Sequence, residues 1–195
     1  MVERGPVEIK FDANQQYQRD AIDSVVDLLA GQEGIEQGVV VPELNDEGTL
    51  FEELVFGNSL ALAPATMRTN LRRVQDRPVV LEDGSTVPAV SAGLRQPLVV
   101  GVLPHQFSVE METGTGKTYV YLRTIAELHL RYGFRKFVVL VPSVAIRQGV
   151  LSSLGMLREH IRDLYDGLQY DHHVYDSRAL TRVRQFATAS HLQIM

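Results

Sequence analysis

The residues most able to do chemistry lie in the stretch FSVEMETGTGKTYVYL, from Phe107 to Leu122. Gly114 and Gly116 permit backbone conformations and close approaches that a side chain would block. Where such a turn follows a strand and opens a helix, its backbone N–H groups converge, and the helix dipole adds about half a positive charge. The stretch therefore predicts an anion site suited to the phosphates of a nucleotide.

Two side chains give this phosphate loop (residues 113–118) its chemistry. Lys117 can reach the β- and γ-phosphates, so we assign it the catalytic role, and the hydroxyl of Thr118 can bind Mg²⁺. The strict nucleotide-binding pattern has glycine where this chain has Met111, but the core TGTGKT is far more specific than a lone pair of glycines. A dinucleotide fingerprint would need glycine at Tyr119, so that interpretation fails. The residues expected to bind the nucleotide are Thr113, Gly114, Thr115, Gly116, Lys117 and Thr118.

Two further stretches could act together with the loop. QQYQRDAID, residues 15–23, lies in an amphipathic helical pattern, and KFVVLVPSVAIRQGV, residues 136–150, runs from an apolar strand into a helix. Ser143 could be a plain N-cap, or it could hold a DNA phosphate together with Pro142 and neighbouring N–H groups. Arg147 could assist such a contact or be solvated.

Taken in order, these stretches resemble the type III restriction enzyme Res subunit, a branch of the superfamily 2 helicases and translocases. METGTGKT, including Met111, is similar to motif I of that family, and KFVVLVPSVAIRQGV is similar to its motif Ia. QQYQRDAID resembles the adenine-reading Q motif. By that resemblance Gln18 would pair with the edge of adenine, with Tyr17 or Arg19 flanking the base.

The resemblance covers nearly the whole chain and is weakest from residue 32 to residue 90. It implies an incomplete RecA-like P-loop NTPase lobe, with ATP and Mg²⁺ as cofactors. The parent activity that it implies is ATP-driven translocation on double-stranded DNA, coupled to endonuclease cleavage. It also implies a methyltransferase (Mod) partner, which recognises the DNA site and binds S-adenosylmethionine.

The order of elements predicts an α/β fold with a parallel sheet, interrupted by an irregular insertion between the Q-like motif and the phosphate loop. Residues 1–31 would form the Q-motif-like N-terminal helix, residues 32–96 the insertion, and residues 97–195 the P-loop core. In the first part, the pattern predicts a helix capped by Asp12 or Asn14 that ends near Gly31.

Short strands and helices are predicted in the other two parts. In the insertion we expect strands or hairpins in 39–51 and in 77–90, the second turning at Asp83-Gly84, and a short helix in 65–75. In the core we expect strands at 97–103, 107–111, 136–141 and from residue 191, the third of them buried on both faces. Helices are expected at 118–132, 144–165 (with a possible break at Gly149 or Gly155) and 177–187, and a loop at 166–176.

Composition limits the classes of protein that fit. The chain has 195 residues, a net charge of −5 and no cysteine, which excludes disulfides and thiolate metal sites. It has no apolar run near the ~20 residues that cross a bilayer and no secretory signal, so we expect a cytoplasmic protein with no membrane partner. Because a lone DNA-binding module is usually basic, any contact with nucleic acid here would be local.

A motor of this class needs a second acidic motif, and the sequence offers no good candidate. Asp46-Glu47 precedes the phosphate loop, and Glu8-Ile9-Lys10 has no aspartate ahead of it that would complete a nuclease site. We therefore expect the first part of a motor lobe, which binds nucleotide weakly, cannot turn it over, and self-associates through an unpaired sheet edge.

Several alternatives stay open. A kinase, a general superfamily 2 helicase, or a non-enzymatic module that binds DNA or a partner would each place a phosphate loop in a different context. His172 and His173 fit a polar loop better than a metal site. Arg178, Arg182 and Arg184 fit a solvated face, with DNA contact as the alternative.

Overall fold

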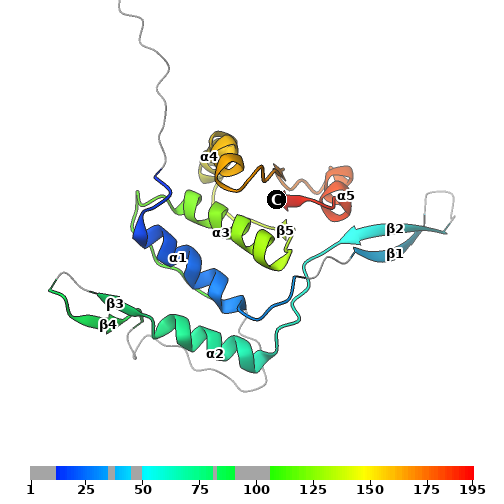
Figure 1. The fold of residues 1–195 in the computed structure, drawn as a ribbon. Coiled ribbons are helices and arrows are strands. Elements are labelled where there is room, and N and C mark those ends of the chain that lie inside the picture. The colour runs from blue at the N-terminus through cyan, green and yellow to red at the C-terminus, as the bar shows by residue number, and fades with distance from the viewer. Residues whose placement is uncertain (1–11, 35–37, 45–49, 81–82, 91–105) are drawn as a thin grey trace, which may run out of the picture.

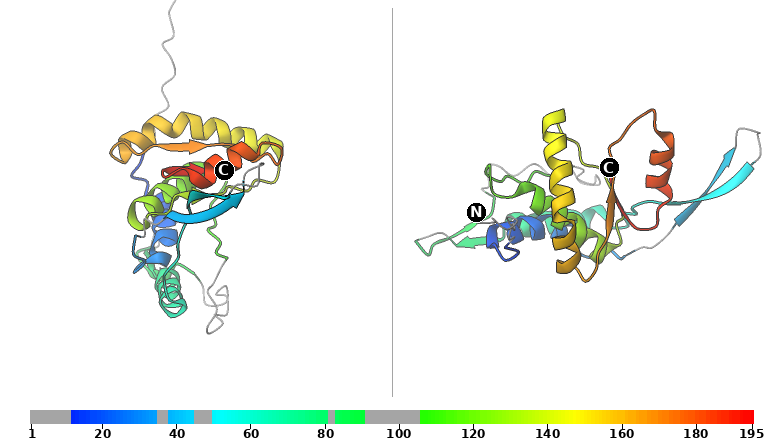
Figure 2. Two further views of the ribbon diagram at one scale, coloured as in Figure 1. Left: turned by 90° about the vertical axis from the view of Figure 1, so that its right-hand side faces the viewer. Right: turned by 90° about the horizontal axis from the view of Figure 1, so that it is seen from above.

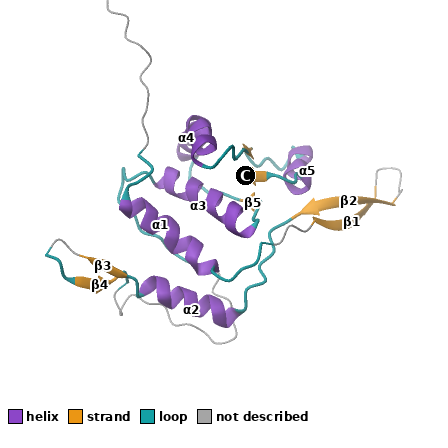
Figure 3. Cartoon of the chain, in the orientation of Figure 1, coloured by secondary structure: helices purple, strands orange, loops and turns teal. Residues whose placement is uncertain are grey.

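Helix α3 (Lys117–Tyr132) lies at the centre of the protein, between α1 (Gln16–Val26) and α4 (Val144–Leu164) (Figure 1). The computed structural model describes residues 12–34, 38–44, 50–80, 83–90 and 106–195. The expected mixture of helices and strands is confirmed (Figure 3). The other elements, in chain order, are the 3-10 turn η1 (Asp27–Leu29), β1 (Gly38–Leu44), β2 (Leu50–Phe56), α2 (Pro64–Gln75), β3 (Pro78–Val80), β4 (Thr86–Pro88), β5 (Lys136–Phe137), β6 (Tyr170–His172), α5 (Leu180–Thr188) and β7 (Leu192–Ile194).

Two glycines set the ends of α3. Gly116 precedes the helix with φ 85°, and Gly133 follows it with φ 72°; glycine adopts both left-handed conformations without strain. The N–H of Gly133 donates to the carbonyl of His129 across 2.9 Å and closes the last turn. The helix predicted at 118–132 is therefore confirmed to within one residue.

The core lies on both sides of α3. A helix with apolar residues on two sides belongs between two layers, and α3 fills that place. Towards α4 and the sheet the buried cluster contains Tyr119, Leu122, Ile125, Leu154, Leu157, Ile161, Tyr170, Leu192 and Ile194. Towards α1 it contains Ile22, Val26, Val120, Leu128 and Tyr132.

The sheet of the core has the order β5-β7-β6, and both pairings are parallel. The prediction of a parallel sheet is confirmed, as is the strand at the start of HLQIM, which is the central strand β7. Strand β6 was missed, because its three residues lie inside the segment expected to be a loop. Its Tyr170 is nonetheless buried and donates from its hydroxyl to the carbonyl of Leu154 across 2.6 Å.

The expectation that 136–141 is buried on both faces is wrong. Only two residues form β5, and the side chains of Val138 and Leu140 are 61% and 90% exposed. Phe137 and Val139 point to the core, whereas the alternate side chains point to the other face of the sheet. Over that face Phe186 of α5 reaches Lys136, and the apolar residues beyond it stay uncovered.

Residues 107–111 also differ from expectation, because they form no strand. Phe107 and Val109 are exposed, and the described strands include none that pairs with them. A strand exists through its ladder of hydrogen bonds to a neighbour, which apolar alternation alone cannot supply. The strand predicted at 97–103 lies outside the described residues.

Helix α4 runs without interruption through Gly149 and Gly155, so neither of the possible breaks occurs. Both glycines face open space, where a missing side chain weakens the helix without bending it. Helix α5 confirms the helix expected near 177–187. Arg178, Arg182 and Arg184 are exposed, as a solvated face requires, and Arg184 also forms an ion pair with Glu53 of β2 across 2.7 Å.

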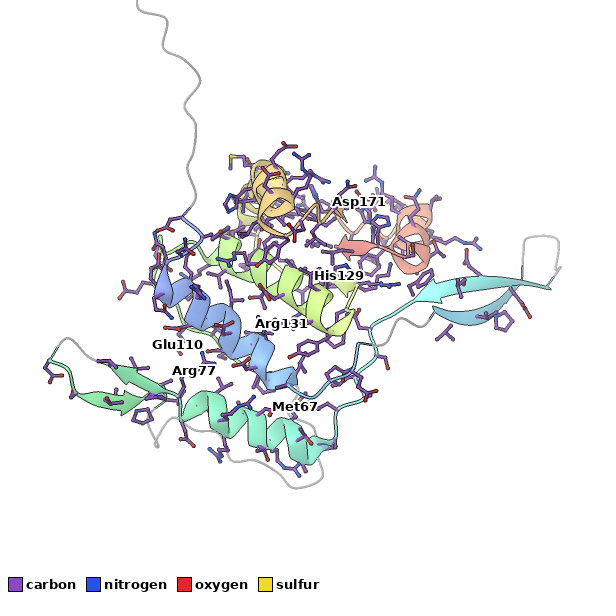
Figure 4. The ribbon with its side chains drawn as sticks, viewed as in Figure 1. Met67, Arg77, Glu110, His129, Arg131 and Asp171 are labelled. Carbon is purple, nitrogen blue, oxygen red and sulfur yellow. The ribbon has the colours of Figure 1, made fainter. Side chains whose placement is uncertain are left out.

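The described residues of the segment predicted to be an insertion form the two hairpins and the helix that were expected there. Strand β1 pairs with β2, and β3 pairs with β4, both antiparallel. The second hairpin turns at Asp83-Gly84, where Asp83 accepts from the N–H of Ser85 across 2.8 Å. Met67 of α2 is buried on the side of α2 that faces the other helices (Figure 4). None of the helices in the described ranges is both long enough and apolar enough to span a membrane.

Helix α1 begins differently from the prediction. Its N-cap is Gln15, without a capping side chain, so Asp12 and Asn14 do not cap it. Asp12 instead accepts from the N–H of Asn14 across 2.9 Å and folds the turn ahead of the helix. The helical segment that starts with α1 ends near Gly31, as expected, and this glycine has φ 92°.

Candidate functional site

The phosphate loop is an open turn that leads directly into α3. Gly114 and Gly116 have φ of 84° and 85°, a left-handed conformation in which other residues are strained. A Cβ on Gly114 would meet nothing within 4 Å, so this side of the loop is open. A Cβ on Gly116 would lie 2.9 Å from Nε2 of Gln18, so this glycine permits close packing against α1.

The backbone amides of the loop are available to a ligand. Among the described residues, none of the N–H groups from Thr113 to Thr118 has a protein acceptor, and no side chain caps α3. The first backbone bond of the helix runs from Val120 to the carbonyl of Gly116, across 3.0 Å. Unbonded amides at the positive end of a helix form a favourable environment for an anion.

Lys117 lies over this loop. Its Nζ donates to the carbonyl of Glu112 across 2.6 Å, and the hydroxyl of Thr115 donates to the same oxygen across 2.7 Å. Within the described part of the chain, no carboxylate pairs with this ammonium group. A bond to a neutral carbonyl is weaker than one to an anionic oxygen, so Lys117 can transfer to a phosphate.

Gln18 connects α1 to the phosphate loop. Its Nε2 donates to the carbonyl of Thr115 across 3.0 Å, and the hydroxyl of Tyr17 lies 3.4 Å from the same oxygen. Gln18 is only 6% exposed, and its Oε1 is buried without a partner among the described residues. The structure thus brings Tyr17, Gln18 and the loop together, although 97 residues separate Gln18 from Thr115.

Arg19 has different surroundings from its two neighbours. It lines a cavity of about 250 Å³ between α1, α3 and the end of α4, to which the phosphate loop contributes no residue. Glu127 and Arg131, which are ion-paired across 2.9 Å, line the same cavity. The other lining residues are Ala13, Asn14, Ile22, Asp23, Arg123 and Leu164.

Arg123 has a positioning role that the sequence analysis missed. It donates through Nη1 to the carbonyl of Ala13 across 2.7 Å, and through Nε to the hydroxyl of Tyr165 across 3.2 Å. It therefore holds the segment before α1 against α3. Burial raises the pKa of Tyr165 to about 12, with the nearby guanidinium opposing that shift, so this hydroxyl stays protonated at neutral pH.

Ser143 lies at the start of α4 and caps that helix. Its side-chain oxygen accepts from the N–H of Ile146 across 3.3 Å, so Ser143 is the N-cap of the helix. Pro142 and Ser143 are exposed, and Arg147 is half-buried with an unpartnered Nε among the described residues.

The two histidines considered for metal binding, His172 and His173, lie at the end of β6 and directly after it. Nδ1 of His172 accepts from Nη2 of Arg158 across 3.2 Å, and Nε2 of His173 is buried without a partner among the described residues. His191 lies 2.8 Å from the carboxylate of Asp171, beside the sheet (Figure 4). Within the described ranges, no three His, Cys, Asp or Glu residues are placed to hold a metal ion. Asp46-Glu47 and Glu8-Ile9-Lys10 lie outside those ranges.

Known proteins are similar to this chain in sequence. A family model described as "Type III restriction enzyme, res subunit" matches residues 13–173. The Res subunit of the EcoPI restriction-modification enzyme from Escherichia phage P1 is 27% identical over 158 residues, 80% of this chain and 14% of that protein. The EcoP15I Res subunit of Escherichia coli is 48% identical over 59 residues, 29% of this chain and 6% of that protein.

A third relative is the StyLTI Res subunit of Salmonella typhimurium, 45% identical over 65 residues, which are 32% of this chain and 7% of that protein. The chain thus spans a small fraction of the length of these curated relatives.

Proposed function

Because the chain belongs to the family of type III restriction enzyme Res subunits, we propose that it is the ATP-binding part of such a subunit's motor. Residues 97–195 would form an incomplete RecA-like lobe, residues 1–31 its Q-like motif, and residues 32–96 an insertion. In the whole protein, this motor would move along double-stranded DNA and couple ATP hydrolysis to DNA cleavage. The methyltransferase (Mod) subunit would recognise the site and bind S-adenosylmethionine.

One observation supports this proposal: the amides from Thr113 to Thr118 are unbonded within the described chain, and the loop is open beside Gly114. These amides would bind the oxygens of a triphosphate, and Lys117 would leave the carbonyl of Glu112 for them. Thr118, in the first turn of α3, would supply a hydroxyl ligand to Mg²⁺. A bound Mg²⁺ would neutralise charge that develops on the phosphates.

Gln18 and Tyr17 would contact the base of the nucleotide. The unpartnered Oε1 of Gln18 is an acceptor that suits the amino group on the edge of adenine. Tyr17 is partly exposed beside it and presents an aromatic ring that could flank the base. Because Gln18 also bonds to Thr115, recognition of the base would be coupled to the shape of the phosphate loop.

The turn at Pro142 and Ser143, with Arg147, is the proposed contact to DNA. Phosphate oxygens could accept from the free N–H groups at the start of α4 while Ser143 still caps the helix. Such contacts position a strand without reading its sequence, which fits a motor that moves along DNA.

A binding titration tests the nucleotide site directly. A fluorescent ATP analogue with Mg²⁺ would be titrated into the wild-type chain, Lys117→Ala, and Arg182→Ala, which removes one exposed positive charge elsewhere. We expect Lys117→Ala to weaken binding at least tenfold and Arg182→Ala to stay within twofold. Equal affinities for all three proteins would refute the proposed site.

A further inference from the structure

Tyr121 has a buried hydroxyl group that bonds to none of the described residues. It lies in the second turn of α3, and its ring packs against the buried cluster between α3, α4 and the sheet. Helix α4 passes over this face of α3 (Figure 2), and the hydroxyl oxygen is closed off from solvent. A buried hydroxyl without a hydrogen bond costs free energy, and most such groups in folded proteins have a partner. The packing of α3 therefore does not explain why this residue is tyrosine rather than phenylalanine.

The hydroxyl of Thr118 is a close neighbour of this group. Thr118 precedes Tyr121 by three positions, so the two side chains lie on the same side of α3. An aromatic side chain in a helix leans towards the N-terminus, over the residues three and four positions earlier. Burial raises the pKa of Tyr121, and the hydroxyl of Thr118 opposes that shift. No hydrogen bond of normal geometry joins the two hydroxyls, so they are neighbours that remain unbonded here.

Thr118 needs such a neighbour if it binds a cation. A threonine hydroxyl that gives a lone pair to Mg²⁺ keeps its proton, and that proton needs an acceptor. A tyrosine oxygen can accept a hydrogen bond, and groups that bond to metal ligands in this way orient the ligand and strengthen metal binding. Within the described part of the chain, no other donor occupies the oxygen of Tyr121.

We propose that Tyr121 is a positioning residue, whose hydroxyl oxygen accepts a hydrogen bond from Thr118 and so turns the lone pairs of Thr118 towards Mg²⁺. This inference rests on the proposed function, in which Thr118 is a ligand to that ion. Tyr121 touches neither the nucleotide nor the ion. It acts through Thr118, so it affects only the part of nucleotide binding that depends on Mg²⁺.

The test compares two tyrosines of the same helix. Tyr121→Phe removes the unbonded hydroxyl and keeps the ring. The matched control is Tyr132→Phe, because the hydroxyl of Tyr132 is bonded: it donates to the carbonyl of Val26 across 3.0 Å. For the full chain, the dissociation constant of a fluorescent, non-hydrolysable ATP analogue would be measured with Mg²⁺ and with EDTA. The thermal unfolding midpoint would be measured without nucleotide.

We expect Tyr121→Phe to weaken binding of the analogue about fivefold with Mg²⁺, which corresponds to one typical hydrogen bond, and to leave binding in EDTA within twofold. Its unfolding midpoint should not fall, since an apolar group replaces an unbonded hydroxyl. Tyr132→Phe should show the opposite pattern, with a lower midpoint and both dissociation constants within twofold. In a Thr118→Ala background, Tyr121→Phe should cause no further loss, because the donor is already absent.

Equal changes with and without Mg²⁺, or no change in either, would overturn the inference. A lower unfolding midpoint in Tyr121→Phe would also overturn it, because the hydroxyl would then have a structural partner in the free protein. So would a further loss in Thr118→Ala/Tyr121→Phe. These outcomes leave the proposed function standing, because the wild type still binds the analogue. A wild type that does not bind it would refute the proposed function, and this inference with it.

Discussion

Nε2 of Gln18 and the carbonyl oxygen of Thr115 lie 3.0 Å apart, so helix α1 is bonded to the phosphate loop. This bond fixes a loop whose own amides have no protein acceptors within the described chain. A side chain far away in sequence thus helps to hold the loop open for a ligand.

Gln18→Ala should therefore loosen the phosphate loop. Loss of this partly buried hydrogen bond is expected to lower the free energy of unfolding by about 0.5–1.5 kcal/mol, since it leaves the Thr115 carbonyl without that donor. The affinity for an ATP analogue should also fall severalfold. Gln16→Ala is the matched control, because Gln16 is exposed and bonds only to Asp20. Urea unfolding of both variants would give the comparison, and equal stabilities would contradict this role.

The two loop glycines allow a second comparison. Alanine at Gly114 or Gly116 incurs a similar left-handed backbone strain of roughly 1–2 kcal/mol. Only at Gly116 would the new Cβ also press against Gln18, at 2.9 Å. We expect Gly116→Ala to destabilise the chain more than Gly114→Ala. In Gln18→Ala/Gly116→Ala the two effects should be less than additive, and full additivity would rule out the contact.

Ser143 can be tested for its two roles independently. Ser143→Ala removes the N-cap of α4 and should lower the free energy of unfolding by about 1 kcal/mol. Ser143→Asp retains a good cap, so stability should be kept, but its charge would repel a DNA phosphate. In a full-length Res subunit we expect Ser143→Asp to weaken DNA binding, as measured by fluorescence anisotropy. If DNA affinity is unchanged in a stable Ser143→Asp variant, the turn does not contact DNA.

The lowered pKa of Lys136 should make the free energy of unfolding depend on pH. Burial, aided by the charge of Arg135, lowers its pKa from 10.5 to about 8. The unfolded chain therefore binds more protons than the folded chain between these two values, so this group makes stability rise from about pH 8 to pH 10.5. As pH falls through 8, that contribution is lost.

Lys136→Met keeps the apolar stem and removes the titrating group. The difference in unfolding free energy between wild type and this variant should change across that pH window, measured by urea unfolding. Taking the difference cancels the contribution of tyrosine titration to both stabilities. Tyr170 is one such tyrosine, because burial raises its pKa to about 12. A difference that stays constant with pH would contradict a lowered pKa.

The sequence predicted the elements whose signals are local. Gly116 and Gly133 mark the ends of α3, and Asp83-Gly84 marks the turn of a hairpin, because each acts through its own backbone conformation. The strand expected at 107–111 and the two-sided burial of 136–141 were wrong for the opposite reason. Both depend on which neighbours lie beside the segment, which spacing along the chain does not encode.

The candidate site also combines features with a local sequence signal and features that depend on long-range contacts. The TGTGKT loop can be predicted from glycine spacing, but the contacts that hold it in place are long-range. Arg123 bonds to the carbonyl of Ala13, 110 residues earlier, and any residue type could supply that carbonyl. Strand β6 was missed since Tyr-Asp-His has little apolar signal, and its pairing with β7 becomes visible only in the folded chain.

The most direct test of the account follows the loop amides themselves. In two-dimensional ¹H–¹⁵N NMR spectra of the chain, added ATP and Mg²⁺ should shift the amide resonances of residues 113–118 most strongly, with smaller shifts around Gln18. In Lys117→Ala the same titration should need at least tenfold more nucleotide. If ATP binds while residues 113–118 keep their positions and other amides move, the phosphate loop is not the nucleotide site.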